Sequence, residues 1–435
     1  NMKNMKKLAA LLVLTSCAGG VEDIDRTQPN ILEKDFFAGE WYASWTAIDV
    51  PYTTGFTFIG AGEGIERVKW DITKSGLVAY RSYDLVEGVD RGNPREGAEV
   101  RGPMMYHFPI RGHFDVERSY NPATGEQSNV LIENRADCEW YECKQFRVDW
   151  GSNIRWRAGN GSYYIQENDD DDAGDAIRID KESGHLEVTL KAFFQPELDD
   201  ELTAYYGFPI PKCWLYANPY WDCRGQTVRV RMTFSRIPHT GDERDAEGNL
   251  VKVGAPITDD YEPVEFNDHR LERFGFFRTT RFHRDQNYGA RESNRDHYAN
   301  LHPIWKKVRE NGQLIPVAQR EPKPIVYYLN KQFPGANAPV NLIPEAQAVA
   351  AEWSEVLKEA VAAAQGKDIS DVPEMFVLCP NNPVKAGDDA LCGTEGLEVR
   401  IGDHRYNKLL WVPNPASSAP GGYGPSHVDP LSGKV

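Results

Sequence analysis

Alternating apolar and polar residues dominate the first half of the chain. Residues 186–190 (Leu-Glu-Val-Thr-Leu) and 228–232 (Val-Arg-Val-Arg-Met) change character at every position, which is typical of half-buried antiparallel strands. Residues 65–72 and 76–85 are joined by a Thr-Lys-Ser-Gly turn, so these two segments predict a hairpin. Further strands rich in aromatic and β-branched residues are expected at 40–48, 107–120, 130–135, 145–150, 163–166, 186–194 and 227–234.

These segments are separated by turn-forming sequences, among them Asn-Pro-Ala-Thr-Gly at 121–125. No repeat of fixed period relates the segments to one another. We therefore predict that residues 36–238 form a β-rich, antiparallel domain, folded as a sandwich or as a barrel-like sheet.

Beyond residue 322 the pattern changes to a strand followed by a long amphipathic helix. Residues 324–329 (Pro-Ile-Val-Tyr-Tyr-Leu) are rich in β-branched and aromatic side chains, as in a buried strand. Pro344 suits a first helical turn, and Gly366 suits the position just past the end of a helix. Apolar residues recur between them at three- and four-residue steps: Ala346, Val349, Ala350, Trp353, Val356, Leu357, Ala360, Val361 and Ala364. Short strands are expected at 375–378, 397–401 and 408–412, and the whole chain is predicted to be α+β.

The residues between these two regions are polar and rich in arginine and aromatic side chains. Residues 239–260 contain many glycines and charged side chains, which predicts a loop or linker. Residues 266–305 crowd Arg, His, Asp and aromatic residues together, as in Arg-Phe-Gly-Phe-Phe-Arg at 273–278. We interpret residues 239–321 as a polar linker and extended connector, in which the aromatic side chains are buried and the arginines pair with an acidic surface.

Composition restricts the class of protein. The 435 residues suggest about three domains of ~150 residues each. An apolar content of 40% with 11% aromatic residues is sufficient for a hydrophobic core. The formal net charge of −16 argues against nucleic acid and against anionic membrane surfaces as partners. It suits an extracytoplasmic protein with a solvated surface.

The first residues resemble a bacterial lipoprotein signal. Lysines precede the apolar run 8–14, which is too short to span a bilayer. The following Leu-Thr-Ser-Cys resembles the lipobox, which implies cleavage before Cys17 and lipidation of its sulfur; an ordinary secretory signal with a chance cysteine is the alternative. Ala18 after the cysteine favours the outer membrane over retention in the inner membrane. We predict a signal peptide at 1–17 and a polar tether at 18–35.

Six cysteines remain after Cys17, in three pairs that are close in sequence: Cys138 and Cys143, Cys213 and Cys223, and Cys379 and Cys392. Six cysteines allow fifteen connectivities, so the sequence leaves the pairing open. Closeness along the chain and an oxidising compartment favour local disulfides. A thiolate metal site is the weaker alternative, because neither a Cys-x-x-Cys motif nor a nearby pair of histidines accompanies them.

The last hundred residues resemble a known family. Residues 400–407 (Arg-Ile-Gly-Asp-His-Arg-Tyr-Asn), 423–426 (Tyr-Gly-Pro-Ser) and 429–433 (Asp-Pro-Leu-Ser-Gly) follow the strand, long helix and short strands described above. Together they look like the front of a metzincin-type zinc protease domain, and are similar to large bacterial zinc-dependent metalloprotease lipoproteins such as those of myxobacteria. Similar strings occur earlier, at 25–30, 49–52, 79–83, 120–126 and 273–278.

The resemblance implies a definite continuation. In this family the Asp-Pro-x-[Ser/Thr]-Gly turn leads into the edge strand that binds substrate, and a helix carrying His-Glu-x-x-His follows. A zincin needs two histidines one helical turn apart, with Glu as general base beside the zinc. None of the ten histidines here is followed by Glu, so residues 322–435 are expected to be the truncated N-terminal part of such a domain. We assign no catalytic and no metal-binding residue in this chain, and expect zinc only in the full-length protein.

Other candidate sites have a structural interpretation that we favour. The acidic run 169–175 suits calcium but lacks the alternating ligands of a calcium loop, which favours a solvated surface turn. Residues 403–406 (Asp-His-Arg-Tyr) combine catalytic residue types but lie between two strands, and are interpreted as framework. His297 and His302 are five apart, which suits no single face of a helix or strand, and are interpreted as hydrogen-bonded structural residues. The Phe/Arg stretch 274–284 suits base stacking, which the acidic chain argues against.

Three functions remain open from the sequence alone. The first, which we favour, is the N-terminal fragment of a lipid-anchored extracytoplasmic zinc metallopeptidase, not catalytically competent alone, with a peptide or protein substrate for the full-length protein. The second is a non-catalytic outer-membrane lipoprotein that binds protein or glycan through its aromatic-rich β domain. The third is a structural envelope component. All three place the chain in the bacterial cell envelope, held to the membrane by the lipid anchor and facing the periplasm or the exterior, with no nucleic-acid partner.

Overall fold

The structure is a computed structural model of the chain. It describes residues 22–82, 84–85, 101–150, 152, 154–158, 161–166, 176–216, 221–246, 250–253, 255–266, 269–285 and 289–435. The predicted signal peptide with Cys17, the start of the tether and the acidic run 169–175 lie outside the described residues.

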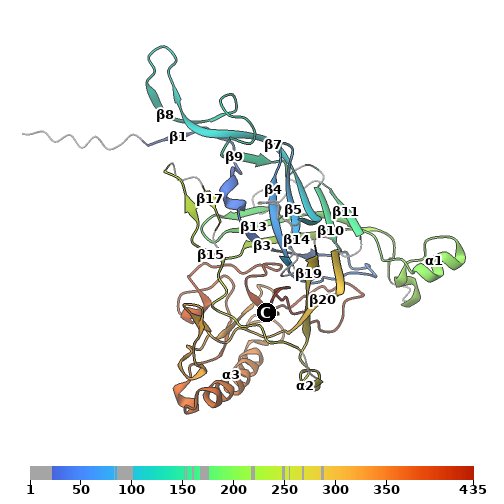
Figure 1. Cartoon of the computed structure of the whole chain (residues 1–435). Coiled ribbons are helices and arrows are strands. Elements are labelled where there is room, and N and C mark those ends of the chain that lie inside the picture. The colour runs from blue at the N-terminus through green and yellow to red at the C-terminus, as the bar shows by residue number, and fades with distance from the viewer. Residues whose placement is uncertain are drawn as a thin grey trace, which may run out of the picture.

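The first half of the chain forms a large antiparallel sheet that curls and closes on itself (Figure 1). The closure follows from the pairing of β7 with both β5 and β10, the two ends of the remaining strand order. In sequence order the strands of the closed sheet are β3 (Glu40–Asp49), β4 (Glu66–Ile72), β5 (Gly76–Ser82), β7 (Arg101–Tyr120), β10 (Ile154–Ala158), β11 (Gly161–Gln166), β13 (His185–Phe194) and β14 (Gln226–Arg236). The prediction of a β-rich antiparallel region is confirmed, in its barrel-like form.

Strand β7 is longer than its neighbours and continues beyond the closed sheet as a projecting ribbon (Figure 1). There it pairs with β8 (Gln127–Asn134) and β9 (Gln145–Val148). Three short strands extend the same sheet: β1 (Ile24–Asp25) beside β8, β2 (Leu32–Glu33) beside β9, and β12 (Ile177–Asp180) beside β13. A 3-10 helix, η1 (Lys34–Phe37), follows β2 and contributes two buried phenylalanines to the core.

One face of each central strand is apolar and fully buried. In β14 the alternate residues Val228, Val230, Met232 and Phe234 are all 0% exposed, as the alternation in the sequence predicts. The ring of Phe234 lies 4.9 Å from that of Tyr106 and 5.1 Å from that of Trp70, centroid to centroid. Both contacts are edge-to-face, an arrangement that stabilises aromatic pairs beyond their buried area.

A lobe between β13 and β14 projects from the side of the sheet (Figure 1). Its helix α1 (Asp200–Tyr206) begins where the Asp199 carboxylate accepts a hydrogen bond from the Leu202 amide, and ends at Gly207, which has a positive φ of 75°. The 3-10 helix η3 (Lys212–Tyr216) completes the lobe. No residue of α1 is buried, and the Cys213–Cys223 disulfide closes the lobe.

The middle of the chain forms several antiparallel strand pairs. They are β15 (His239–Thr240) with β18 (Ala255–Pro256), β16 (Glu243–Arg244) with β17 (Leu250–Lys252), β19 (Arg278–Asp285) with β20 (Gly289–Ala299), and β21 (Arg309–Glu310) with β22 (Gln313–Leu314). Strand β6 (Asp84–Leu85) adds to β19 in parallel. The short helix α2 (His269–Arg273) precedes the β19–β20 hairpin, and the 3-10 helix η4 (Val317–Gln319) follows β22.

The expected burial of the aromatic side chains in this region is wrong for three phenylalanines. Phe274, Phe276 and Phe277 are 80%, 40% and 75% exposed. They occupy the turn between α2 and β19, which points away from the rest of the molecule (Figure 1). Because a protruding turn has no neighbouring layer, its apolar side chains stay in solvent.

The last part of the chain contains a three-stranded parallel sheet and the longest helix. The sheet has the order β24 (Phe376–Cys379), β23 (Ile325–Leu329), β25 (Asn407–Leu409), and the crossover between β23 and β24 is α3 (Ile343–Gln365). Ser354 of α3 accepts a hydrogen bond from the Met375 amide at 2.9 Å, which fixes the helix to the sheet. The predicted helix and the strands near 324–329, 375–378 and 408–412 are confirmed, and the chain is α+β.

The strand predicted at 397–401 is wrong. The amide of Val399 donates to Asn382 Oδ1 at 3.0 Å, and Asn382 Nδ2 donates to the Val399 carbonyl at 2.7 Å. One side-chain amide therefore takes the place of a neighbouring strand. Two short 3-10 helices, η5 (Ile369–Asp371) and η6 (Ala390–Cys392), flank β24 in this part of the chain.

Helix α3 buries only part of its predicted apolar stripe. Ala350, Val361 and Ala362 are buried, whereas Val349, Trp353 and Val356 are more than half exposed. The parallel sheet covers one side of the helix, and the remaining apolar positions face solvent because a stripe this wide extends past the edge of a three-stranded sheet.

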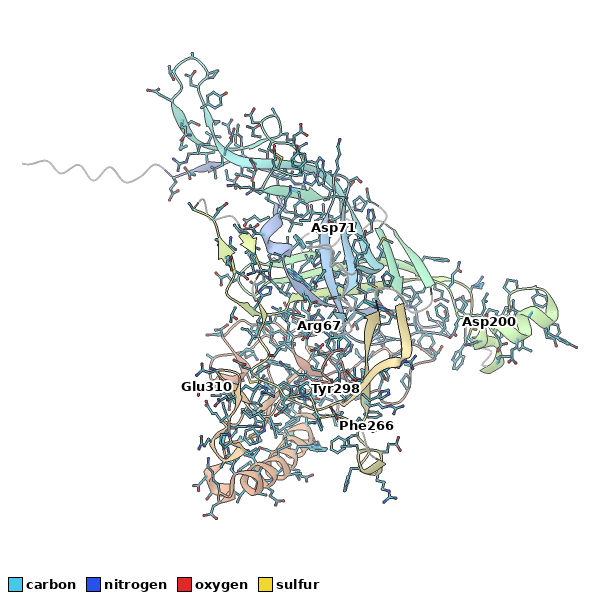
Figure 2. All side chains as sticks on the ribbon, in the orientation of Figure 1. Arg67, Asp71, Asp200, Phe266, Tyr298 and Glu310 are labelled. Carbon is cyan, nitrogen blue, oxygen red and sulfur yellow. A yellow bond between two sulfur atoms is a disulfide. The ribbon has the colours of Figure 1, made fainter. Side chains whose placement is uncertain are left out.

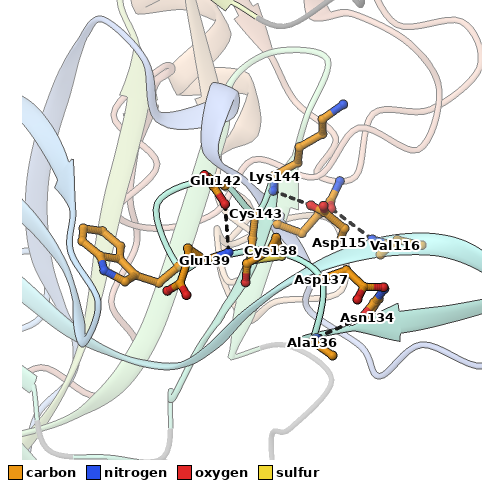
Figure 3. Close-up of a disulfide and its surroundings, with 12 residues drawn as sticks. Asp115, Val116, Asn134, Ala136, Asp137, Cys138, Glu139, Glu142, Cys143 and Lys144 are labelled. Atoms are coloured by element: carbon orange, nitrogen blue, oxygen red, sulfur yellow. Dashed lines mark hydrogen bonds between the residues drawn. A yellow bond between two sulfur atoms is a disulfide. The ribbon is translucent and has the colours of Figure 1, made fainter.

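The six cysteines form three local disulfides: Cys138–Cys143, Cys213–Cys223 and Cys379–Cys392. The first closes a tight loop beside β7, where the Lys144 amide donates to the Asp115 carboxylate at 2.6 Å (Figure 3). Disulfides of this number indicate an extracytoplasmic or secreted protein. Among the described residues, every helix is too short or too polar to span a bilayer.

Candidate functional site

The face of the central strands opposite the apolar core is polar, and it is buried as well. His185, Glu187 and Thr189 alternate with apolar residues on β13, and they are 3%, 2% and 4% exposed. Neighbouring strands present more buried polar residues on this face: Ser44 on β3 and Arg231, Thr233 and Ser235 on β14. We call this polar face, together with residues 400–408 that cover it, the seam.

Residues 400–405 lie directly on this polar face because its side chains bond their backbone. Thr233 Oγ1 donates to the Gly402 carbonyl at 2.9 Å, and Arg231 donates to the Ile401 carbonyl at 2.5 Å. Gly402 has a φ of +93°, and a Cβ there would lie 3.2 Å from the Arg231 side chain. Only glycine therefore combines this backbone conformation with so close an approach.

His404 lies on the polar face across two neighbouring strands, β3 and β14, which pair with each other. Its Nδ1 shares a hydrogen bond of 2.7 Å with Ser44 Oγ on β3, and its Nε2 shares one with Ser235 Oγ on β14. Burial lowers the pKa of this imidazole to about 3, so His404 is neutral at physiological pH. A neutral ring with both nitrogens bonded joins the two parts of the chain without a buried charge.

Charged groups surround His404 in the seam. Arg405 binds Asp403 through two hydrogen bonds, from Nε at 3.0 Å and from a terminal nitrogen at 2.8 Å. Burial raises the pKa of Asp403, but the hydrogen bonds from Arg405 and the charges around the carboxylate together outweigh it and bring the pKa to about 2. Glu187 lies 3.2 Å from a terminal nitrogen of Arg400 and 3.8 Å from Nε of Arg231. The two carboxylates are therefore each paired with a guanidinium group.

Three potential metal ligands meet at this point. His185 Nε2 lies 3.5 Å from a Glu187 oxygen and 3.9 Å from an Asp403 oxygen, and one ligand atom of each residue lies within 4.8 Å of the others. Neither ring nitrogen of His185 has a hydrogen-bond partner among the described residues. Residues of β12, β13 and the segment 396–405 line an open pocket of about 490 Å³ here. In size and residue type the cluster suits a divalent cation.

The charge of the cluster does not suit a cation. Two carboxylates face four cationic side chains: Arg231, Arg400, Arg405 and Lys408. Burial lowers the pKa of Lys408 to about 8, so this ammonium still carries its charge at neutral pH. A dication would add to an excess of positive charge in a region of low dielectric. The residues present also lack the paired histidines that a zincin requires, and we interpret the cluster as a buried ion-pair network rather than a zinc site.

A second contact joins the sheet to the turn at 429–433. Arg67 of β4 donates two hydrogen bonds to the Asp429 carboxylate, at 2.9 and 2.7 Å, and a third to Glu40 at 3.0 Å. The Arg67 and Asp429 side chains are 12% and 6% exposed, and Figure 2 labels Arg67 where the sheet meets the last part of the chain. Bidentate pairing between buried partners fixes both position and orientation.

The turn itself is rigid. The Asp429 carboxylate also accepts hydrogen bonds from the Leu431 amide at 3.0 Å and from Ser432 Oγ at 2.9 Å. The residues after the turn pair with Leu301, whose amide donates to the Gly433 carbonyl at 3.1 Å. Asp429 thus links its own turn, the closed sheet and the residues that follow β20.

The structure brings some of the sequence candidates together and leaves others apart. Residues 403–406, interpreted from sequence as framework, lie in the seam. His297 is hydrogen-bonded to Thr280 Oγ1 at 3.1 Å, as expected of a structural histidine. The sequence analysis missed His185, Glu187 and Arg231. The sequence did contain a signal for them. Charged residues alternate with apolar ones on both β13 and β14, and these two paired strands carry charges of opposite sign, Glu187 and Arg231.

Comparison of this chain with protein-family models, with curated proteins and with solved structures finds no match.

Proposed function

We propose that this chain is the N-terminal part of a lipid-anchored, extracytoplasmic zinc metallopeptidase, in which the closed β sheet carries and orients the protease-like part. The chain alone has no catalytic function in this proposal, because it lacks the paired histidines and the glutamate of the zinc motif. Zinc and a peptide or protein substrate belong to the full-length protein. The envelope location follows from lipidation at Cys17, which places the protein at the outer membrane.

The observation that carries the proposal is the bidentate ion pair between Arg67 and Asp429. The resemblance assigns the Asp-Pro-Leu-Ser-Gly turn at 429–433 to the approach of a substrate-binding edge strand. A peptide that adds to an edge strand is aligned by main-chain hydrogen bonds, so the direction in which that strand leaves its turn matters. Arg67 sets this direction from the sheet domain through a bidentate contact.

The order of elements in the last part of the chain also supports the proposal. The resemblance implies a strand, a long helix and further short strands before residue 400, and β23, α3 and β24 follow in that order. The seam holds residues 400–405 against the sheet on the other side. The protease-like part is therefore held at two places, the seam and the turn, as a scaffold role requires.

Sequencing the gene downstream of the Val435 codon tests the proposal directly. We expect His-Glu-x-x-His, followed by Gly and a third His, within the frame that continues from Val435. A stop codon at that point contradicts the proposal.

The longer product gives a second test of the scaffold role. Arg67→Leu is expected to lower its peptide-cleaving activity while its zinc content, measured by atomic absorption, stays unchanged. Lys252→Met removes an exposed pair with Glu243 and serves as the matched control with unchanged activity. Loss of zinc with Arg67→Leu, or full activity, contradicts a role of Arg67 in orienting the turn.

A non-catalytic outer-membrane lipoprotein that binds protein or glycan is the second candidate. The observation in its favour is the α1 lobe, which exposes aromatic side chains on an ordered support: Tyr205, Tyr206, Phe208 and Trp214. A stop codon after Val435 makes this candidate the preferred one.

A further inference from the structure

We propose that the turn between α2 and β19, residues 273–278, is a contact site for a zwitterionic phospholipid surface. We call these residues (Arg-Phe-Gly-Phe-Phe-Arg) the α2 tip. The contact acts through side chains and is separate from any lipid on Cys17. It adds an activity to the chain whether or not a protease domain follows.

The α2 tip displays apolar rings on an ordered turn. Phe274 and Phe277 are 80% and 75% exposed, among the most exposed large apolar side chains of the described residues. The turn is fixed by hydrogen bonds from the Phe276 amide to the Leu271 carbonyl at 3.1 Å and from the Asn300 amide to the Phe277 carbonyl at 2.9 Å. Gly275 makes the reversal possible with a φ of +76°. The rings are therefore presented outward by the backbone.

Arginines flank the rings on both sides. Arg273 ends α2 and Arg278 begins β19, and both are exposed. The Arg278 guanidinium lies 5.8 Å from the ring centroid of Phe266, which Figure 2 labels at the base of the tip. Aromatic rings partition into the boundary between headgroups and acyl chains, and arginine reaches back from there to phosphate oxygens. The two residue types at this spacing match the two layers of a phospholipid surface.

The size of the patch favours a lipid surface over a protein partner. Three phenylalanines at these exposures offer together about 400 Å², given roughly 200 Å² for each ring. A stable protein interface needs about 800 Å² from each partner. The tip protrudes and its phenylalanine side chains have no polar atoms, so these rings offer none of the hydrogen bonds that position a protein partner. Insertion of a few rings into a bilayer requires no such hydrogen bonds.

Charge determines the kind of lipid. The chain carries a formal net charge of −16, which repels anionic surfaces at long range. A zwitterionic surface produces little long-range repulsion and still offers phosphates to Arg273 and Arg278.

The α1 lobe provides an internal control. It also exposes aromatic rings, with Tyr205 at 81% and Phe208 at 52%. The first residues of this lobe, however, are acidic: Glu197, Asp199, Asp200 and Glu201. The α2 tip and the α1 lobe are therefore similarly exposed but differ in local charge. Comparing them shows whether membrane contact needs arginines beside the rings or only exposed rings.

The experiment is sedimentation of the full chain with phosphatidylcholine vesicles. Phe274→Ser with Phe277→Ser is expected to reduce the bound fraction at least tenfold, and Arg273→Gln with Arg278→Gln to reduce it several-fold. Tyr205→Ser with Phe208→Ser in the α1 lobe should leave binding unchanged. All variants share the same N-terminal residues, so a difference between them reports the tip and not the signal segment. Equal binding of the Phe274/Phe277 variant and the unaltered chain, or an equal loss in the α1 variant, overturns the proposal.

Hydrogen exchange on the unaltered chain gives a second measurement that needs no substitution. The amides of residues 274–277 are expected to exchange more slowly with phosphatidylcholine vesicles present than without, while those of the α1 lobe exchange at the same rate. Unchanged exchange at the α2 tip overturns the proposal even if the chain sediments with the vesicles through another segment.

Discussion

The two faces of β13 and β14 are both buried, but in different ways. One face packs aromatic and aliphatic side chains into the closed sheet, with Met232 and Phe234 at 0% exposure. The other face holds Glu187, Arg231 and Thr233 against residues 400–405. The apolar face gains stability from removal of surface from water. The polar face pays a desolvation cost and gains a defined docking geometry.

The two faces therefore have different roles: the apolar face mainly stabilises the fold, and the polar face mainly orients residues 400–405. The apolar face tolerates exchange of one large hydrophobe for another, because its contacts are not directional. The seam depends on particular donors and acceptors, so it specifies the position of residues 400–405 relative to the sheet. Each of the following tests separates these two roles.

The largest effect is expected from a cavity in the apolar face. Phe234→Ala removes a fully buried ring that contacts Trp70, Tyr106 and Phe108. We expect a loss of about 3–5 kcal/mol in the free energy of unfolding, measured by urea denaturation followed by tryptophan fluorescence. Phe234→Leu, which keeps most of the volume, should lose less than half as much. Equal losses for both variants would show that the ring is not packed as described.

Breaking the seam at one charge is expected to cost slightly less. Glu187→Gln leaves Arg400 and Arg231 without their carboxylate, and an uncompensated buried charge costs about 3 kcal/mol. Replacing Glu187 and Arg400 together by Leu should restore most of the stability, because a matched apolar pair leaves less charge unpaired. The same urea titration measures both variants. If the double variant is less stable than the single one, the ion pair between Glu187 and Arg400 stabilises the fold in addition to orienting residues 400–405.

The contact between Arg67 and Asp429 should show an intermediate loss. Arg67→Lys keeps the charge but not the two parallel hydrogen bonds, and we expect a loss of about 2 kcal/mol. Lys252→Met at the exposed pair with Glu243 should change stability by less than about 0.5 kcal/mol. Thermal unfolding at low and high salt measures both. A salt-sensitive loss at Arg67 would mean that the pair is more hydrated than its burial indicates.

The smallest effect is the pH dependence of the seam. The pKa of His404 is about 3 in the folded chain, below its ordinary value of about 6.5. Between pH 3 and 6.5 the unfolded chain therefore binds more protons than the folded chain. The contribution of His404 to stability is complete above pH 6.5 and is lost as the pH falls towards 3. Between pH 6.5 and 5 the loss is about 1.5 kcal/mol.

His404→Gln isolates this contribution from that of other histidines whose pKa is also lowered, such as His113 and His427. Glutamine can bond Ser44 or Ser235 but does not titrate. The stability difference between the unaltered chain and this variant, measured by urea denaturation at each pH, should shrink as the pH falls from 6.5 to 5. A constant difference across this range would place His404 in contact with solvent.

The alternation in the sequence predicts most of the sheet. Strands at 186–194 and 227–234, and the hairpin at 65–85, agree with β13, β14, β4 and β5 within a few residues. The same alternation suggested half-buried strands, and that interpretation is wrong for β13 and β14, whose polar faces are covered. Periodicity reports which face is apolar, but it contains no information on what covers the polar face.

The candidate site was less predictable because its members are far apart along the chain. Glu187 and Arg400 meet only in the folded molecule, and no spacing rule relates them. Trp353 on α3 and Phe274 on the α2 tip are apolar residues that the sequence pattern suggested would be buried, and both are exposed. A side chain's apolarity suggests burial, but burial depends on a neighbouring layer that a local pattern cannot reveal.

The polar face of β13 and β14 has a consequence for the order in which the chain folds. The strands of the closed sheet end at Arg236, so the sheet can form in an interval before residues 400–405 dock on it. During that interval His185, Glu187 and Arg231 are hydrated, and the unfinished molecule presents charges instead of a sticky apolar surface. A charged face stays hydrated before residues 400–405 dock, and it defines their position after they have docked. The residues that orient the last part of the chain thus also protect the first part from aggregation during folding.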